Sequence, residues 1–159
     1  MIFSHISDTH LGFIQYHSEE RENDVYAAFN EAIDISIKDH VDFVILVGDI
    51  FHVPNPSGKA ILVLANALKR LKKNNIDSFF ILGDHDISRI RATPVPFVYH
   101  NLDFSKYIGD GNPIIYKDVM IAGFDKRRKS EIESFEQDFA RVDAEAKKHQ
   151  GHKIIVLHQ

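Results

Sequence analysis

The chain has 159 residues, of which 44% are hydrophobic and 26% charged, a composition typical of one folded domain and not of a disordered segment. Its formal net charge of -4 excludes binding of nucleic acid through overall positive charge. The absence of cysteine excludes disulfides, thiolate-bound zinc, iron–sulfur clusters and a cysteine nucleophile, so the ten histidines become the residues of interest.

The N-terminal residues and the apolar runs contain no targeting or membrane signal. The first residues lack a basic segment followed by an apolar one, and no apolar run approaches the roughly 20 residues of a membrane span. We therefore expect a soluble, cytoplasmic protein without a membrane partner.

Strands and helices are predicted to alternate along the first half of the chain. The predicted elements are a strand over 2–7, a helix over 19–38, a continuous apolar strand over 43–47, a helix that begins after a Ser57 cap and runs to about 74, and a strand over 78–82. Such alternation indicates right-handed crossovers that build a parallel sheet.

The pattern is less regular in the second half. The predicted elements are one helical turn or an irregular loop over 97–102, a hairpin of 113–116 with 119–123, a helix over 130–149 and a strand over 153–157. We expect the hairpin to add antiparallel strands to an edge of the sheet. The fold class is therefore α/β, a mostly parallel sheet flanked by helices, with residues 1–159 forming part of one domain that we interpret as truncated after its last strand.

Acidic and histidine residues follow four of the predicted strands. The residues at these strand ends are Asp8 and His10, Asp49, Asp84 and His85, and His158. The carboxyl ends of parallel strands gather at one edge of a sheet, and four such endings have roughly one chance in a hundred of arising by accident. We expect these side chains to converge, although capping of the following helices is the alternative for each of them.

Converging carboxylates and imidazoles without sulfur indicate a transition-metal site. Such donors suit manganese, iron(II) or zinc better than calcium. Two ions are expected because at least five donors converge and Asp49 has two oxygens with which to bridge. A pair of ions about 3.5–4 Å apart clamps the attacking and leaving oxygens of a phosphoryl group, which predicts phosphoester hydrolysis.

The sequence blocks at these strand ends resemble those of a known family. The blocks 8–12 (DTHLG), 48–52 (GDIFH) and 83–86 (GDHD) are similar to the D-x-H, G-D and G-N-H-[DE] blocks of calcineurin-like metallophosphoesterases. The opening block, the G-D-x-F-H block and the ending Leu157-His158-Gln159 most closely resemble the double-strand-break repair nucleases of the meiotic recombination eleven family, whose bacterial counterpart is SbcD.

The resemblance implies roles for individual residues. Asp8 and His10 would bind the first metal ion, Asp49 would bridge, and the residue at 84 with His158 would bind the second. His85 would stabilise the charge of the substrate phosphate or protonate the leaving oxygen, and His52 would orient that phosphate.

Two departures from the family pattern affect this transfer. The family has asparagine where this chain has Asp84, whose extra negative charge is expected to preserve metal binding but to reduce the rate. The family's last block, a G-H-x-H with one ligand for each metal, is absent from these 159 residues. We therefore expect this chain to bind metal incompletely and to be a weak catalyst.

The resemblance also implies partners and cofactors. The family depends on manganese, degrades DNA from 3′ ends and cuts it internally. It dimerises and acts at the nucleoid with an SMC-like repair ATPase in recombination. For this chain Mg, Fe or Zn are the alternative metals. The basic run 126–129 is a candidate DNA contact or a solvated loop, and Ile61, Leu62 and Leu64 mark either a dimer surface or plain core. The alternative functions are a small-molecule phosphodiesterase, a protein phosphatase and a non-catalytic DNA-tethering scaffold.

Overall fold

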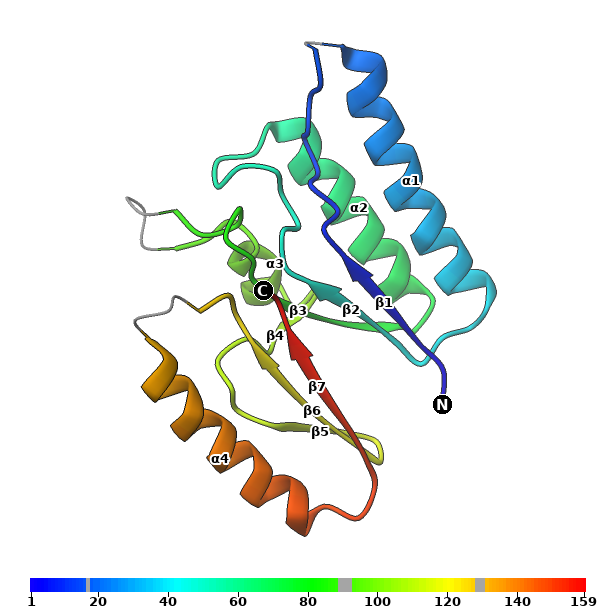
Figure 1. Cartoon of the computed structure of the whole chain (residues 1–159). Coiled ribbons are helices and arrows are strands. Elements are labelled where there is room, and N and C mark those ends of the chain that lie inside the picture. The colour runs from blue at the N-terminus through cyan, green and yellow to red at the C-terminus, as the bar shows by residue number, and fades with distance from the viewer. Residues whose placement is uncertain (17, 89–92, 128–130) are drawn as a thin grey trace.

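The computed structural model describes residues 1–16, 18–88, 93–127 and 131–159 (Figure 1). The helices are α1 (Glu19–Lys38), α2 (Gly58–Lys73), α3 (Phe97–Asn101) and α4 (Ile132–Lys148). The strands are β1 (Phe3–Ser7), β2 (Phe43–Val47), β3 (Asp77–Ile81), β4 (Lys106–Tyr107), β5 (Ile114–Tyr116), β6 (Val119–Phe124) and β7 (His152–Leu157).

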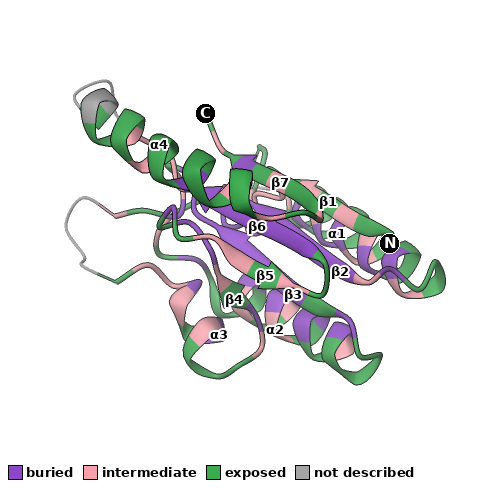
Figure 2. Cartoon of the chain, turned by 90° about the horizontal axis from the view of Figure 1, so that it is seen from below, coloured by how far each residue is buried: buried purple, intermediate pink, exposed green. Residues whose placement is uncertain are grey.

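The strands form two sheets that pack between helices. One sheet has the order β1-β2-β3-β4 and is parallel throughout, and the other has the order β5-β6-β7, with β5 antiparallel and β7 parallel to β6. The helices α1 and α2 cover one outer face and α4 covers the other, so the buried strands lie in the middle of the molecule (Figure 2). The fold is thus a layered α/β fold with helices on both sides.

The continuous apolar strands are explained by three apolar layers. In β2, Val44 and Leu46 pack against the helices, whereas Ile45 and Val47 face the second sheet. Strand β6 is buried in the same way, between the first sheet on one face and α4 on the other. Each strand of this kind needs apolar residues at every position because neither of its faces contacts water.

Most of the predicted elements are confirmed. Helix α1 and strand β2 have the predicted bounds, and Ser57 caps α2 by accepting a hydrogen bond from the Ala60 N–H at 3.2 Å. Residues 97–101 form a helical turn, the second half contains the predicted hairpin, and α4 covers most of 130–149. The two-residue strand β4 was not predicted.

The predicted position of the hairpin is wrong. Residues 113–123 do not extend an edge of the parallel sheet but build, with β7, a separate sheet packed on its face. The physical reason is that β6 is buried on both faces by the first sheet and α4, a situation that produces the same continuous apolar run as a central parallel strand.

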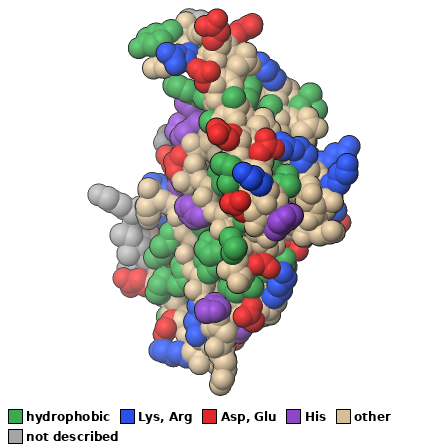
Figure 3. All heavy atoms as spheres, turned by 90° about the vertical axis from the view of Figure 1, so that its right-hand side faces the viewer, with side chains coloured by type: hydrophobic (Ala, Val, Ile, Leu, Met, Phe, Trp, Pro, Cys, Tyr) green, Lys and Arg blue, Asp and Glu red, His purple; other side chains and the backbone are tan. Residues whose placement is uncertain are grey.

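Strands β1 and β7 each have a single strand neighbour within the described part of the chain. Their outer sides are exposed, with Phe3, Ile155 and Leu157 among the accessible apolar residues. Apolar side chains gather in the middle of the face shown in Figure 3. None of the helices in the described ranges is long and apolar enough to cross a bilayer.

Candidate metal centre

The loops that follow β1 and β2 run side by side and place the first ligands. The His10 N–H donates to the Asp49 carbonyl at 2.9 Å, the Leu11 N–H donates to the Ile50 carbonyl at 2.9 Å, and the His52 N–H donates to the Leu11 carbonyl at 3.1 Å. The pairing of the two strands therefore continues into the loops. These main-chain bonds, together with one from the Thr9 hydroxyl to the Ile50 carbonyl, hold Asp8 and His10 beside Asp49 and His52.

Three of the candidate ligands have left-handed backbone conformations. The φ angles are 53° at Asp8, 41° at His10 and 47° at Asp49, next to 67° at Gly48. A side chain disfavours this region, and such strain concentrates at functional sites, where the surrounding structure holds it in place. In these loops the left-handed residues turn the backbone sharply at the strand ends.

Asp49 is shared by two groups of potential metal ligands. The ligand atoms of Asp8, His10 and Asp49 lie within 4.8 Å of one another, and so do those of Asp49, Asp84 and His158. A cation about 2.0–2.2 Å from each ligand atom requires separations of roughly 3–4 Å, somewhat below the 4.8 Å within which these atoms lie. The Asp49 side chain is buried, so it forms the centre of the cluster.

His158 is oriented as a metal ligand. Its Nδ1 lies 3.0 Å from the Val47 carbonyl oxygen, so this nitrogen has to carry the proton and donate it. Its Nε2 is then left with a free lone pair, 3.5 Å from Asp49 Oδ2 and 3.9 Å from Asp84 Oδ1. Metal-binding histidines are commonly fixed by a bond of this kind to a carbonyl oxygen.

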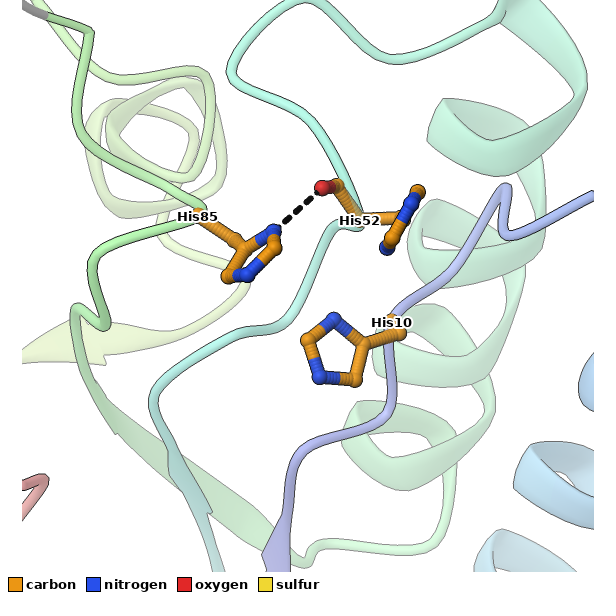
Figure 4. Close-up of side chains that lie close together, drawn as sticks. All are labelled: His10, His52 and His85. Atoms are coloured by element: carbon orange, nitrogen blue, oxygen red, sulfur yellow. Dashed lines mark hydrogen bonds between the residues drawn. The ribbon is translucent and has the colours of Figure 1, made fainter.

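Three histidines form a second cluster beside these ligands. His10, His52 and His85 approach one another from three different loops (Figure 4). The His85 Nδ1 lies 2.6 Å from the His52 carbonyl oxygen, and donation to that oxygen raises the pKa of His85. Burial and the neighbouring imidazoles of His10 and His85 lower the pKa of His52.

The structure brings all seven residues singled out from the sequence to one place. The loops after β1, β2 and β3 supply six of them and the end of β7 supplies His158, so both sheets contribute (Figure 1). Asp8 and Asp84 are exposed, whereas His10, His52, His85 and His158 are half-buried. The donor set of oxygen and nitrogen atoms fits divalent metal ions.

Gly83 and Asp86 help to shape this site, although the sequence did not assign either of them a definite role. A Cβ on Gly83 would overlap the main-chain nitrogen and the carboxylate of Asp49, so the close approach of the two loops requires glycine. Asp86 is 1% exposed and accepts three main-chain hydrogen bonds, and burial raises its pKa to about 6. The repeated Gly-Asp pair was a usable signal for the glycine.

A layered α/β fold whose strand ends bring together aspartate and histidine side chains in two groups with a common aspartate is typical of a metallophosphoesterase. In agreement with this class, the family model described as calcineurin-like phosphoesterase matches residues 1–158, and the chain belongs to this family.

Comparison with curated proteins shows which members of this family the chain is similar to. The chain is similar to proteins named DNA double-strand break repair protein Mre11, with 42% identity over 120 residues in Saccharolobus solfataricus and 34% over 166 residues in Methanococcus maripaludis. These alignments cover 75% and 100% of this chain but 32% and 44% of the relatives. The chain thus spans less than half the length of these relatives.

Proposed function

We propose that this protein is a manganese-dependent nuclease that hydrolyses DNA phosphodiesters during double-strand break repair, by exonuclease action from 3′ ends and by internal cleavage. The supporting observation is that buried Asp49 is shared by two ligand groups directly beside three histidines. The names of the curated relatives support DNA as the substrate.

Asp8, His10 and Asp49 would hold one divalent ion, and Asp49, Asp84 and His158 would hold the other. Two ions bound there supply positive charge to the attacking and leaving oxygens of a phosphodiester. Oxygen and nitrogen ligands without sulfur match manganese, and they also accept Mg, Fe or Zn.

The histidine cluster would bind and protonate the substrate. His85 donates from Nδ1 to the His52 carbonyl, and this bond favours the imidazolium form, in which Nε2 also carries a proton. In that form Nε2, directed away from the bond, can give its proton to the departing oxygen. His52 and His10 each have a buried Nδ1 without a hydrogen-bond partner in the described part of the chain. We assign His52 the role of orienting the phosphate.

The direct test is cleavage of DNA by the chain. End-labelled duplexes with accessible 3′ ends and a labelled single-stranded circle are incubated with excess protein and Mn²⁺, beside a phosphopeptide. We expect slow release of nucleotides and internal cuts, both stopped by a chelator. Hydrolysis of the phosphopeptide without cleavage of DNA would instead identify a protein phosphatase, and hydrolysis of a small phosphodiester alone would identify a small-molecule enzyme.

Replacing His85 by alanine is expected to abolish cleavage while leaving metal binding intact. The reason is that His85 belongs to the histidine cluster and to neither of the two ligand groups that share Asp49. The rate should fall at least about a hundredfold, the usual contribution of a positioned proton donor. Single-turnover cleavage and Mn²⁺ titration of the same preparation measure both effects, and loss of bound Mn²⁺ would show that His85 is a ligand.

A non-catalytic DNA-tethering scaffold is the second candidate, favoured by the carboxylate at position 84. The side chain of Asp84 is 62% exposed and lies beside His158, so its charge adds to that of Asp49 where a phosphate would approach. We expect Asp84→Asn to raise the rate of phosphodiester hydrolysis, because one negative charge is removed and an amide oxygen still binds metal. If neither form hydrolyses any phosphodiester with any divalent metal, the scaffold function is correct.

We also propose that the protein acts as a homodimer with an SMC-like repair ATPase at the nucleoid. Leu62 on α2 and Val98 on α3 are exposed, and these helices are linked by a hydrogen bond from the Tyr99 hydroxyl to the Ile61 carbonyl. Leu64, in contrast, is buried and belongs to the core. These accessible apolar residues suit contact with a second copy.

The basic run is only partly described. Arg127 pairs with Asp138 at 2.9 Å, so its charge is compensated, while Arg128 and Lys129 lie outside the described residues. Contact of this run with DNA stays a proposal.

A further inference from the structure

Asp86 links the two loops that hold most of the candidate site. Its Oδ2 accepts hydrogen bonds from the Ile50 N–H at 3.2 Å and the Gly83 N–H at 3.1 Å, and its Oδ1 accepts one from the Phe51 N–H at 3.0 Å. The first and third of these donors belong to the loop after β2, and the second belongs to the loop after β3. One carboxylate therefore joins the two loops.

This link contributes to the assembly of the ligand groups, beside the two bonds that His85 makes to Asp49 and to the His52 carbonyl. The group of Asp8, His10 and Asp49 lies on loops that are joined by their own main-chain bonds. The group of Asp49, Asp84 and His158 combines the loop after β2 with the loop after β3, which Asp86 connects. Asp86 is thus placed to affect the second group more than the first, whose two loops are also joined by their own bonds.

Another hydrogen bond joins the loop after β2 to the loop after β3 and depends on the distance between them. The His85 N–H donates to Asp49 Oδ1 at 3.0 Å. Asp86 does not take part in this bond, yet the bond requires that Gly83 and the main chain of Asp49 stay in close contact. Hydrogen exchange of the His85 amide therefore reports whether the two loops stay close together, and it can be measured without metal.

We propose that Asp86 is the positioning residue that holds the Asp84 loop against the Asp49 loop, so that the second metal ion and His85 have their correct geometry. The proposal rests on the proposed function, because it assigns part of the two-metal site. A buried carboxylate with three main-chain donors is costly to replace, because each donor left without a partner in the interior is destabilising. The effect on the second ion distinguishes positioning from general stability.

The experiment compares the unaltered chain with Asp86→Asn and Asp86→Ala. The asparagine keeps the size and one acceptor oxygen, whereas alanine leaves all three donors unpaired. Calorimetric titration with Mn²⁺ should show that affinity at the second position falls about 10–100-fold in Asp86→Asn, with the first position little changed. Asp86→Ala should have the larger effect, provided that circular dichroism shows it folded.

Amide hydrogen exchange of the metal-free proteins gives an independent readout. We expect the His85 amide to exchange at least tenfold faster in Asp86→Asn than in the unaltered chain. If the unaltered chain binds no Mn²⁺, the two-metal function fails, and the exchange of the His85 amide alone decides whether Asp86 positions the loops.

Asp125→Asn is the matched control. Asp125 is also a shielded carboxylate that accepts a main-chain bond, from the Leu82 N–H at 2.7 Å. In this variant the Leu82 carbonyl still accepts a hydrogen bond from the Lys126 N–H, so the segment that follows β6 stays joined to Leu82. The control should therefore lower stability but not Mn²⁺ affinity. Unchanged binding and exchange in Asp86→Asn, equal weakening at both positions, or the same loss of affinity in Asp125→Asn would each overturn the proposal.

Discussion

Replacing Asp49 by alanine is expected to remove both metal ions at once. Asp49 is the only residue common to the two ligand groups, and its buried carboxylate lies within 3.8 Å of His10 Nε2 and 3.5 Å of His158 Nε2. Removal of its two oxygens leaves each ion with fewer ligands, so the Mn²⁺ affinity of both positions should fall at least about a hundredfold. Equilibrium dialysis or calorimetric titration measures the loss.

The metal-free stability of this variant separates binding from folding. Without metal, Asp49→Ala should unfold at a lower temperature than the unaltered chain, because the His85 N–H loses its acceptor, and it should gain no stability from added Mn²⁺. Asp24→Ala, which alters an exposed carboxylate on α1, should behave like the unaltered chain in both measurements. Loss of one ion with retention of the other would contradict a bridging role for Asp49.

Replacing Gly83 by alanine is expected to be strongly destabilising. The new Cβ would overlap the main-chain nitrogen and carboxylate of Asp49, and this part of the backbone is fixed by its bonds to neighbouring loops. Overpacking of this kind costs about 3 kcal/mol, which lowers the unfolding temperature of a chain of this size by roughly 10 °C. Mn²⁺ binding should weaken as well, because Asp49 has to move.

Gly58→Ala provides the comparison for this change. Gly58 is the first residue of α2 and no atom lies within 4 Å of the position of an added Cβ. This variant should be as stable as the unaltered chain or more stable by about 0.5–1 kcal/mol, because alanine restricts the unfolded state. Thermal unfolding of the two variants side by side tests the argument, and equal melting temperatures would show that the loops move apart freely.

The first three strands were predictable because apolar runs that alternate with amphipathic helices are typical of a parallel sheet. The runs around β2 and β3 are separated by amphipathic helices, which leaves the parallel sheet as the simple solution. The run that forms β6 has the same apolar pattern, yet it belongs to the second sheet. A continuous apolar run indicates that both faces of a strand are buried. It does not indicate whether a helix or a second sheet covers each face, so the division into two sheets could not be predicted from the sequence.

The site was more predictable than the sheet arrangement. Asp8, Asp49 and His85 follow strands of the first sheet, and the rule that ligands gather at carboxyl ends of strands applies to them directly. His158 follows a strand of the second sheet but reaches the same place, because β7 and β2 point their ends toward one another. The function of Asp86 depends on hydrogen bonds to residues about 35 positions away in sequence, and spacing cannot predict those.

We propose that Asp49 joins two divalent ions where the ends of both sheets meet. Crystals of the chain grown with Mn²⁺ and measured at a wavelength where manganese scatters anomalously give the direct test. Two anomalous peaks are expected about 3.5–4 Å apart, one on each side of the Asp49 carboxylate, between His10 and His158. Peaks elsewhere on the surface, with none in contact with Asp49 at saturating Mn²⁺, would contradict this proposal.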